Sequence, residues 1–202
     1  MKNDSAPISA GRPRAFDADV ALEKAMKVFW QKGYEGTSLS DLTEAMGINR
    51  PSLYAAFGNK EELFRKALDR YSEGPASYFI KALNEPTARA VIENVLQSSV
   101  DLLSNPSNPR GCLVLQGALC CSDDAGTVRQ EAQERRMKAQ EHIEARLQRA
   151  QAEGDLPAEA KPADLARYVT MVMHGLSVQA SNGATRDEMK RAVDIALQAL
   201  PV

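Results

Sequence analysis

The chain has 202 residues, 44% of them hydrophobic, and this length accommodates one or two domains that need neither disulfides nor a metal for stability. Its formal net charge at pH 7 is −2, which gives no overall attraction to nucleic acid. Any DNA binding would therefore depend on a local surface and not on bulk charge.

The sequence carries no sign of export or membrane insertion. Its first 11 residues contain one lysine and no apolar run, and no apolar stretch approaches the length of a bilayer-spanning helix. Three cysteines, Cys112, Cys120 and Cys121, form no CxxC pair, and their odd number favours reduced thiols that pack as small apolar residues. We therefore predict a cytoplasmic protein without a membrane partner, a metal site or a cofactor.

Apolar residues recur with the period of a helix from residue 17 to the end, and no segment alternates like a strand, so the predicted fold class is all-α. Four helices are expected in the N-terminal third. Gly33 and Gly47 are placed to end the first two. The residues expected to cap the four helices are Asp17, Ser38, Asn49 and Asn59.

The Gly74-Pro75 pair interrupts this pattern and is the best candidate for a domain boundary. We therefore divide the chain into a flexible basic arm (1–14), an N-terminal domain (15–72) and a C-terminal domain (73–202). In the last of these, the stretch 112–121 is apolar nearly all round, which predicts a helix buried on every side. A long, mostly surface-facing helix is expected over 124–154.

Two helices with broad apolar stripes close the chain, one beginning at Pro162 and one at Thr185. Together they expose more apolar surface than a monomer of this size hides easily, so we predict a homodimer joined through them. The alternative is that the stripes only complete the core. The predicted interface residues are Leu165, Val169, Val172, Leu176, Met189, Val193, Ala196 and Leu200.

The segment 38–57 reads as two short helices joined by a tight turn at Gly47-Ile48-Asn49, the arrangement of a helix-turn-helix. A plain helical hairpin could have the same spacing. The outer face of the second helix carries one guanidinium, two hydroxyls and a methyl group, and no acid. These groups suit guanine edges, phosphates and thymine methyls. They belong to Arg50, Ser52, Tyr54 and Ala55.

Two neighbouring segments add possible phosphate contacts. Lys60 stands at the N-terminus of the fourth helix, where free N–H groups attract anions. Arg12 and Arg14 lie in a short basic arm that could follow a minor groove, although a disordered tail explains them equally well.

Several spaced motifs closely resemble the tetracycline-repressor (TetR) family over about the first 70 residues. They are Gly-Arg-Pro-Arg at 11–14, Phe-Trp-Gln-Lys-Gly-Tyr at 29–34, Ala-Met-Gly-Ile at 45–48, Ser-Leu-Tyr-Ala-Ala-Phe at 52–57 and Asn-Lys-Glu-Glu-Leu-Phe at 59–64. The resemblance implies an N-terminal DNA-binding domain, a C-terminal effector-binding and dimerisation domain, and repression of a palindromic operator that a small molecule relieves. The DNA contacts it implies are Ser38, Ser40, Arg50, Pro51, Ser52, Tyr54, Ala55 and Lys60.

Two positions depart from the family pattern. Ala56 stands where a polar residue is frequent, which removes one possible phosphate contact, and Thr43 stands where alanine is usual. Neither change removes the DNA-binding face.

An effector pocket is expected where segments have more apolar surface than an outer helix needs. We predict that it is lined by Tyr78, Phe79, Leu115, Leu119, Met171 and His174. Such a pocket would favour an apolar or aromatic effector over a nucleotide, because no cluster of Arg or Lys is apparent to hold phosphates. The alternative is a solid core.

Other classes of function have weaker support. The sequence contains no phosphate-binding glycine loop, no HExxH motif and no nucleophile elbow, so we predict that the chain is not an enzyme. A helical adaptor that binds protein and not DNA stays possible. A thiol-reactive redox or electrophile sensor with the same DNA-binding head is the main alternative, although no Lys or Arg lies between Cys112 and Cys121 to activate a thiol.

Overall fold

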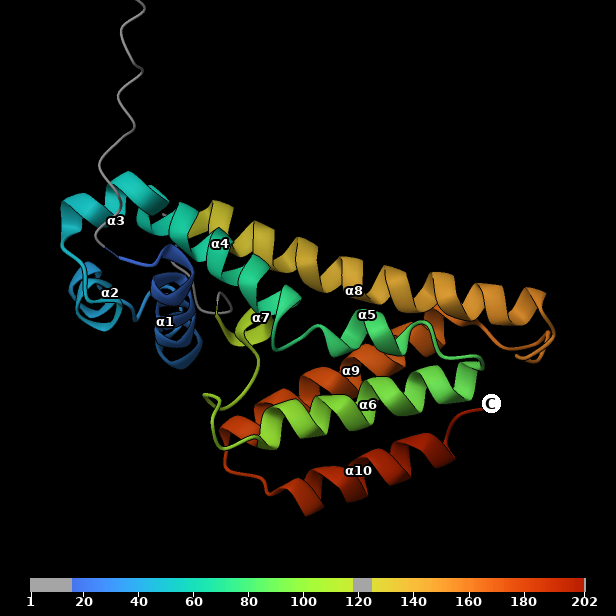
Figure 1. Ribbon diagram of the computed structural model, residues 1–202. Coiled ribbons are helices and arrows are strands. Elements are labelled where there is room, and N and C mark those ends of the chain that lie inside the picture. The colour runs from blue at the N-terminus through green and yellow to red at the C-terminus, as the bar shows by residue number, and fades with distance from the viewer. Residues whose placement is uncertain (1–15, 118–124, 202) are drawn as a thin grey trace, which may run out of the picture.

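The computed structural model describes residues 16–117 and 125–201, and over these residues the chain is entirely helical (Figure 1). This confirms the predicted all-α fold class. The helices are α1 (Ala18–Lys32), α2 (Leu39–Met46), α3 (Arg50–Phe57), α4 (Lys60–Glu73), α5 (Tyr78–Ala82), α6 (Ala88–Ser104), α7 (Leu113–Gln116), α8 (Gly126–Ala152), α9 (Pro162–Ser181) and α10 (Arg186–Gln198). None of these helices has both the length and the apolar character needed to cross a bilayer.

Local capping chemistry sets the helix starts, as the sequence predicted. The Asp17 carboxylate accepts hydrogen bonds from the first backbone N–H groups of α1, and the Asn49 side chain accepts one from Ser52 N. Complete capping boxes open α2, α4 and α10, where the cap residue and the third helical residue satisfy each other's backbone N–H groups. The N-terminal helices therefore begin where their side chains replace missing backbone partners.

Helices α1–α4 form a compact head with its own core. The rings of Phe29 and Phe64 meet edge to face at 5.0 Å between centroids, and those of Trp30 and Tyr71 at 4.7 Å. All four rings are buried. Because α4 supplies two of these four rings, it is part of the head. It is also the covalent link from the head to the rest of the chain.

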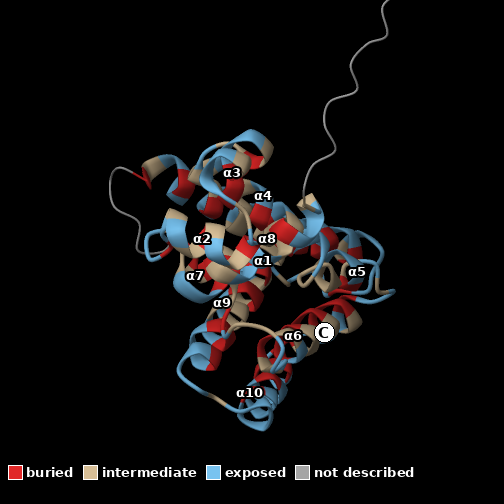
Figure 2. Cartoon of the chain, turned by 60° about the vertical axis from the view of Figure 1, so that its left-hand side comes forward, coloured by how far each residue is buried: buried red, intermediate tan, exposed pale blue. Residues whose placement is uncertain are grey.

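Helices α5, α6, α8, α9 and α10 form the body. Figure 1 shows α6, α9 and α10 lying roughly side by side, with α8 running from the head across the body. The buried side chains of α6, α9 and α10 pack into one core with those of the C-terminal half of α8 (Figure 2). The long helix α8 is thus the element that spans both parts of the molecule.

The apolar segment after residue 111 differs from its prediction. Among the described residues 112–117, Leu113–Gln116 is helical, and this turn is not buried on every side, since Leu113 and Leu115 are buried while Val114 and Gln116 are half-buried. Cys120, Cys121 and Leu119 lie outside the described residues. Helix α5 was not predicted at all.

The stripes of α9 and α10 belong to the chain's own core, which corrects the predicted dimer interface at its six buried residues and leaves it a prediction at the half-buried Leu165 and Val172. Helix α6 covers them, and a partner chain cannot reach side chains that are already buried. The buried members are Val169, Leu176, Met189, Val193, Ala196 and Leu200, while Leu165 and Val172 are partly buried against the same core. The apolar side chains that α9 and α10 leave exposed are Met171, Val178 and Ile195.

Candidate functional sites

The turn between α2 and α3 has the tight geometry that a helix-turn-helix requires. Gly47 adopts a left-handed conformation with φ of 71°, and its N–H donates to the carbonyls of Thr43 and Glu44. Ile48 N donates to Thr43 O at 3.1 Å. The side chain of Thr43, the departure noted above, donates back to the carbonyls of Leu39 and Ser40 and leaves the turn intact.

Helix α3 buries one face in the head and presents the other to solvent. Leu53 and Phe57 are buried, whereas Tyr54 is 47% exposed and Arg50, Pro51 and Ala55 are exposed as well. Ser52 is half-buried. The outer face therefore presents the chemistry that the sequence predicted for reading DNA.

Arg50 and Ser40 lie together at the junction of α2 and α3. The Arg50 guanidinium donates to Ser40 Oγ at 3.2 Å, and both side chains are exposed. No described acidic group forms an ion pair with Arg50. A weak neutral contact holds the guanidinium in place and leaves its charge available.

Ser38 has a structural task besides its predicted DNA contact. Its Oγ accepts from Asp41 N and donates to Asp41 Oδ2, so its hydroxyl is occupied by the capping box. A hydrogen bond from Lys32 Nζ and those from Ser38 hold the pKa of Asp41 well below its usual range. This corner of the head is therefore fixed by charge-assisted bonds.

Lys60 is held at the first turn of α4, with its ammonium 4.3 Å from the centroid of the Tyr34 ring. The N-terminus of α4 is less open to anions than the sequence suggested. The Glu62 carboxylate accepts a hydrogen bond from Asn59 N, and the Asn59 side chain accepts one from Glu62 N. Glu61 adds a second negative charge in the same turn. Of the two features, the Lys60 side chain and not the helix end carries the positive charge that the predicted phosphate contact requires. Arg12 and Arg14 lie outside the described residues.

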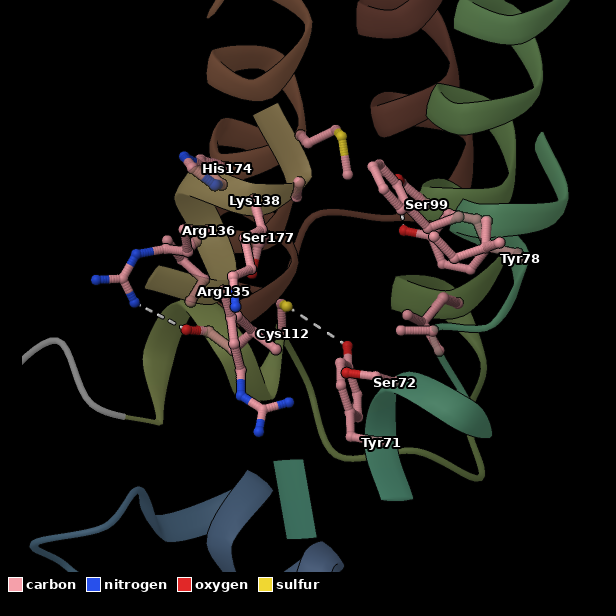
Figure 3. Close-up of a pocket in the computed structure, with 18 of the residues that line it drawn as sticks. Tyr71, Ser72, Tyr78, Ser99, Cys112, Arg135, Arg136, Lys138, His174 and Ser177 are labelled. Atoms are coloured by element: carbon pink, nitrogen blue, oxygen red, sulfur yellow. Dashed lines mark hydrogen bonds between the residues drawn. The ribbon is translucent and has the colours of Figure 1, made fainter. Parts of the chain in front are cut away.

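A cavity of about 280 Å³ lies between α4, α5, α6, α7, α8 and α9. Four of the predicted effector residues, Tyr78, Phe79, Leu115 and His174, line it (Figure 3). Met171 does not, because it is 64% exposed on the other side of α9, and its neighbour Met173 lines the cavity instead. Leu119 falls outside the described residues, so its placement stays a prediction.

Several polar lining residues were missed from the sequence. Tyr78 donates to Ser99 Oγ over 2.9 Å, because the Ser99 hydroxyl itself donates to Val95 O. Tyr71 donates to Cys112 Sγ over 3.4 Å, and both contacts are drawn in Figure 3. Burial raises the pKa of Tyr78 to about 12 and holds that of Tyr71 well above its usual value, so both phenols are neutral donors at physiological pH.

Helix α8 also brings Arg135, Arg136 and Lys138 to the cavity wall. This corrects the expectation that no cluster of Arg or Lys borders the pocket. These residues follow Cys112 by more than 20 positions, so only the packing of α8 against α7 and α9 reveals the cluster. Arg136 donates to Val114 O at 2.9 Å, and Arg135 pairs with Glu131 and with Asp69 of α4.

The cavity wall is bonded directly to the head. Trp30 Nε1 donates to Gly111 O and Tyr34 N donates to Gly117 O, both at 2.8 Å, so each end of the α7 segment is fastened next to α1. Leu113 is fully buried in the core of the head. A change in the cavity wall at Cys112 can therefore reach the head through α7 as well as along α4.

Comparisons with known proteins agree with this architecture. Residues 21–67 match the family described as bacterial regulatory proteins, tetR family, and residues 87–196 match the tetracyclin repressor-like C-terminal domain. The HTH-type transcriptional repressor ComR of Escherichia coli is 34% identical over 195 residues, which cover 96% of this chain and 93% of ComR. The HTH-type regulator YezE of Bacillus subtilis is 30% identical, over 94% of this chain and 99% of YezE.

Solved structures are similar over nearly the whole chain. The TetR family regulator CifR, as a cysteine mutant in complex with 26-bp double-stranded operator DNA, superimposes with a TM-score of 0.91 at 43% identity, covering 95% of this chain and all of CifR. With a helix-turn-helix head, a matching C-terminal domain and relatives aligned from end to end, the chain belongs to the TetR family of transcriptional regulators.

Proposed function

We propose that the protein is a repressor that binds a palindromic double-stranded operator as a homodimer in the cytoplasm and leaves it when a small effector binds. It acts by binding and not as an enzyme. The outer face of α3 carries the proposal, because Arg50, Tyr54 and Ala55 are exposed there without an acidic neighbour in ion-pair contact. The complex of CifR with operator DNA shows that a close relative binds such a duplex.

DNA titrations at two salt concentrations test this function. The probe is a labelled duplex from the promoter region of the protein's own gene, with a shuffled duplex of equal composition as competitor. A repressor should prefer the promoter, and its affinity should fall steeply with salt because bound phosphates release counterions. Arg149→Ala, an exposed site on the far half of α8, is the matched control. Equal, weak binding of both duplexes would contradict the proposal.

The homodimer is proposed through the apolar side chains that the body leaves uncovered. Met171 and Val178 lie two turns apart on α9, and Ile195 is 69% exposed on α10. The small residues Gly175 and Ala192 are exposed on the same two helices, and Ala199 is exposed directly after α10. Side chains of this kind pack closely between helices, and their burial against a second copy favours association.

The proposal that an effector releases the operator rests on the position of the cavity. The cavity includes Tyr71 of α4, and its wall continues into the α7 segment that is bonded to α1. A ligand that binds better to an arrangement with a shifted α4 or α7 would shift the orientation of the head. Effector binding and operator binding would then oppose each other.

A thiol-reactive sensor is the second candidate, and it has one specific observation in its favour. Cys112 lines the cavity and its Sγ accepts a hydrogen bond from Tyr71, so an adduct there would occupy the effector site directly. N-Ethylmaleimide, which adds its C=C bond across a thiol, tests this. Release of operator DNA from the wild type but not from Cys112→Ser would support the candidate, and equal release from both would contradict it.

A further inference from the structure

The charges around the cavity are of one sign. Among the described lining residues are three cations from α8, Arg135, Arg136 and Lys138, and no aspartate or glutamate. Arg135 is neutralised by its partners on α4 and α8, but Arg136 contacts a carbonyl and has no described carboxylate in ion-pair contact. Burial lowers the pKa of Arg136, as expected for a partly desolvated cation without a counter-ion.

One buried hydroxyl in the cavity wall has no partner within the described residues. Ser177 on α9 is only 2% exposed, and its Oγ makes no hydrogen bond. Thr170, the other buried serine or threonine of α9, does not share this state, since its hydroxyl donates to Ala166 O. An unsatisfied buried hydroxyl is costly unless something else binds it.

Figure 3 shows Ser177, Lys138 and Arg136 coming from one wall of the cavity and Tyr78 and Ser99 from the wall across from them, with the Arg136 guanidinium turned outward to Val114 O. The rest of the lining is mainly apolar and includes Phe79, Leu102 and Met173. The cavity of about 280 Å³ is at or below the lower end of the range for drug-sized ligands, roughly 300–1,000 Å³. Its occupant must therefore be compact and mostly apolar, with one polar end.

We propose that the effector is a small carboxylic acid with an apolar or aromatic body, bound as the anion. Its carboxylate accepts the Ser177 hydroxyl and is neutralised by Lys138 and by Arg136, whose guanidinium turns from Val114 O into the cavity when the acid binds. Its body lies against Phe79, Leu102 and Met173. This deepens the proposed function by naming the chemical class of its effector. Nucleotides are excluded by size, and uncharged apolar molecules would leave the Ser177 hydroxyl without a partner and add no counter-charge for Arg136 and Lys138.

Calorimetric titration of the full-length protein with matched pairs of probes tests the proposal. The pairs are 3-phenylpropanoate with 3-phenylpropanamide, and octanoate with octanamide, which differ only in the charge and donors of the polar end. Charge-assisted hydrogen bonds should make each acid bind roughly tenfold or more tightly than its amide. The double variant Arg136→Gln/Lys138→Gln should lose this preference.

Ser177→Ala gives a readout that a merely structural residue would not give. Because Ser177 Oγ has no partner in the protein, the variant should keep the melting temperature of the ligand-free protein while binding each acid several-fold more weakly. Ser98→Ala is the matched control. The Ser98 hydroxyl donates to Asn94 outside the cavity, so this variant should lose some stability and keep its affinity for the acids.

Each other outcome has a definite meaning. Equal binding of acid and amide, binding of neither, or unchanged acid affinity in Ser177→Ala would overturn the proposal. Operator titrations on the same samples separate this failure from failure of the proposed function. Operator binding without acid binding would support the proposed repressor function and contradict the carboxylic-acid effector. Acid binding without operator binding would contradict the repressor function and support the effector class.

Discussion

At the scale of single residues, Arg50 is the group on which base recognition should depend most. It is exposed at the start of α3, and its single described hydrogen bond goes to Ser40. Arg50→Ala should weaken binding to the operator by about 1–3 kcal/mol and relax the preference at one base pair, because a bidentate contact to a base edge is lost. Fluorescence anisotropy with single-base operator variants measures both effects.

Lys60 provides the contrast to Arg50. Lys60→Ala should weaken binding to operator and shuffled DNA by the same factor and make the salt dependence less steep, since a phosphate contact carries no sequence information. Ser40→Ala removes the hydroxyl that accepts the Arg50 hydrogen bond, and it separates the effect of losing this contact from the effect of losing the guanidinium. An Arg50→Ala protein with full affinity and full specificity would show that α3 is not the recognition helix.

Tyr78 should give the protein a stability change at alkaline pH. Its pKa is raised from 10.0 to about 12 by burial, so between these values the unfolded chain loses a proton that the folded chain keeps. The contribution of Tyr78 is therefore complete below pH 10 and decreases as the pH rises through about 12. Denaturant titrations should show a smaller loss of stability over this interval in Tyr78→Phe than in the wild type. Parallel curves would contradict the assignment.

At the scale of elements, the short helix α7 connects the cavity to the head, because it lines the cavity and also packs in the head core. Leu113 is fully buried in the head core although it belongs to the second half of the chain by sequence. Leu113→Ala should lower the free energy of unfolding by about 2–5 kcal/mol, because it removes buried methyl groups and leaves a cavity. Urea denaturation measures the loss.

Val114 is the matched position for this test. It is half-buried on the adjacent face of α7, so Val114→Ala should cost much less than Leu113→Ala. Similar losses for the two variants would mean that α7 does not penetrate the head core.

At the scale of the whole molecule, the proposed homodimer depends on the exposed faces of α9 and α10. Val178→Glu and Ile195→Glu place charges where the proposed interface would exclude water, and should convert dimers into folded monomers with much weaker operator binding. Light scattering coupled to size exclusion measures the mass. Met137→Glu, at a side chain 53% exposed on α8, is the control that should stay dimeric. Dimers that persist in the first two variants would place the interface elsewhere.

The buried stripes of the same two helices show what could not be predicted from the sequence. The periodicity of α9 and α10 identified their apolar stripes correctly, but it could not show that α6 covers them. Val193 and Leu176, predicted to contact a partner, are buried in the chain's own core. An apolar stripe predicts that its side chains are covered, but it does not identify the helix or partner chain that covers them.

The sequence by itself determined the four helices of the DNA-binding head and their caps, because these depend on neighbours in the chain, whereas it missed α5. The Asp17, Ser38 and Asn49 caps and the Gly47 turn each act over at most five residues, and the same spacing carried the family resemblance. Tertiary structure alone decided the cavity. It brings Arg136 beside the α7 segment and leaves Ser177 without a partner, since side chains far apart in the sequence meet only when the whole chain has packed.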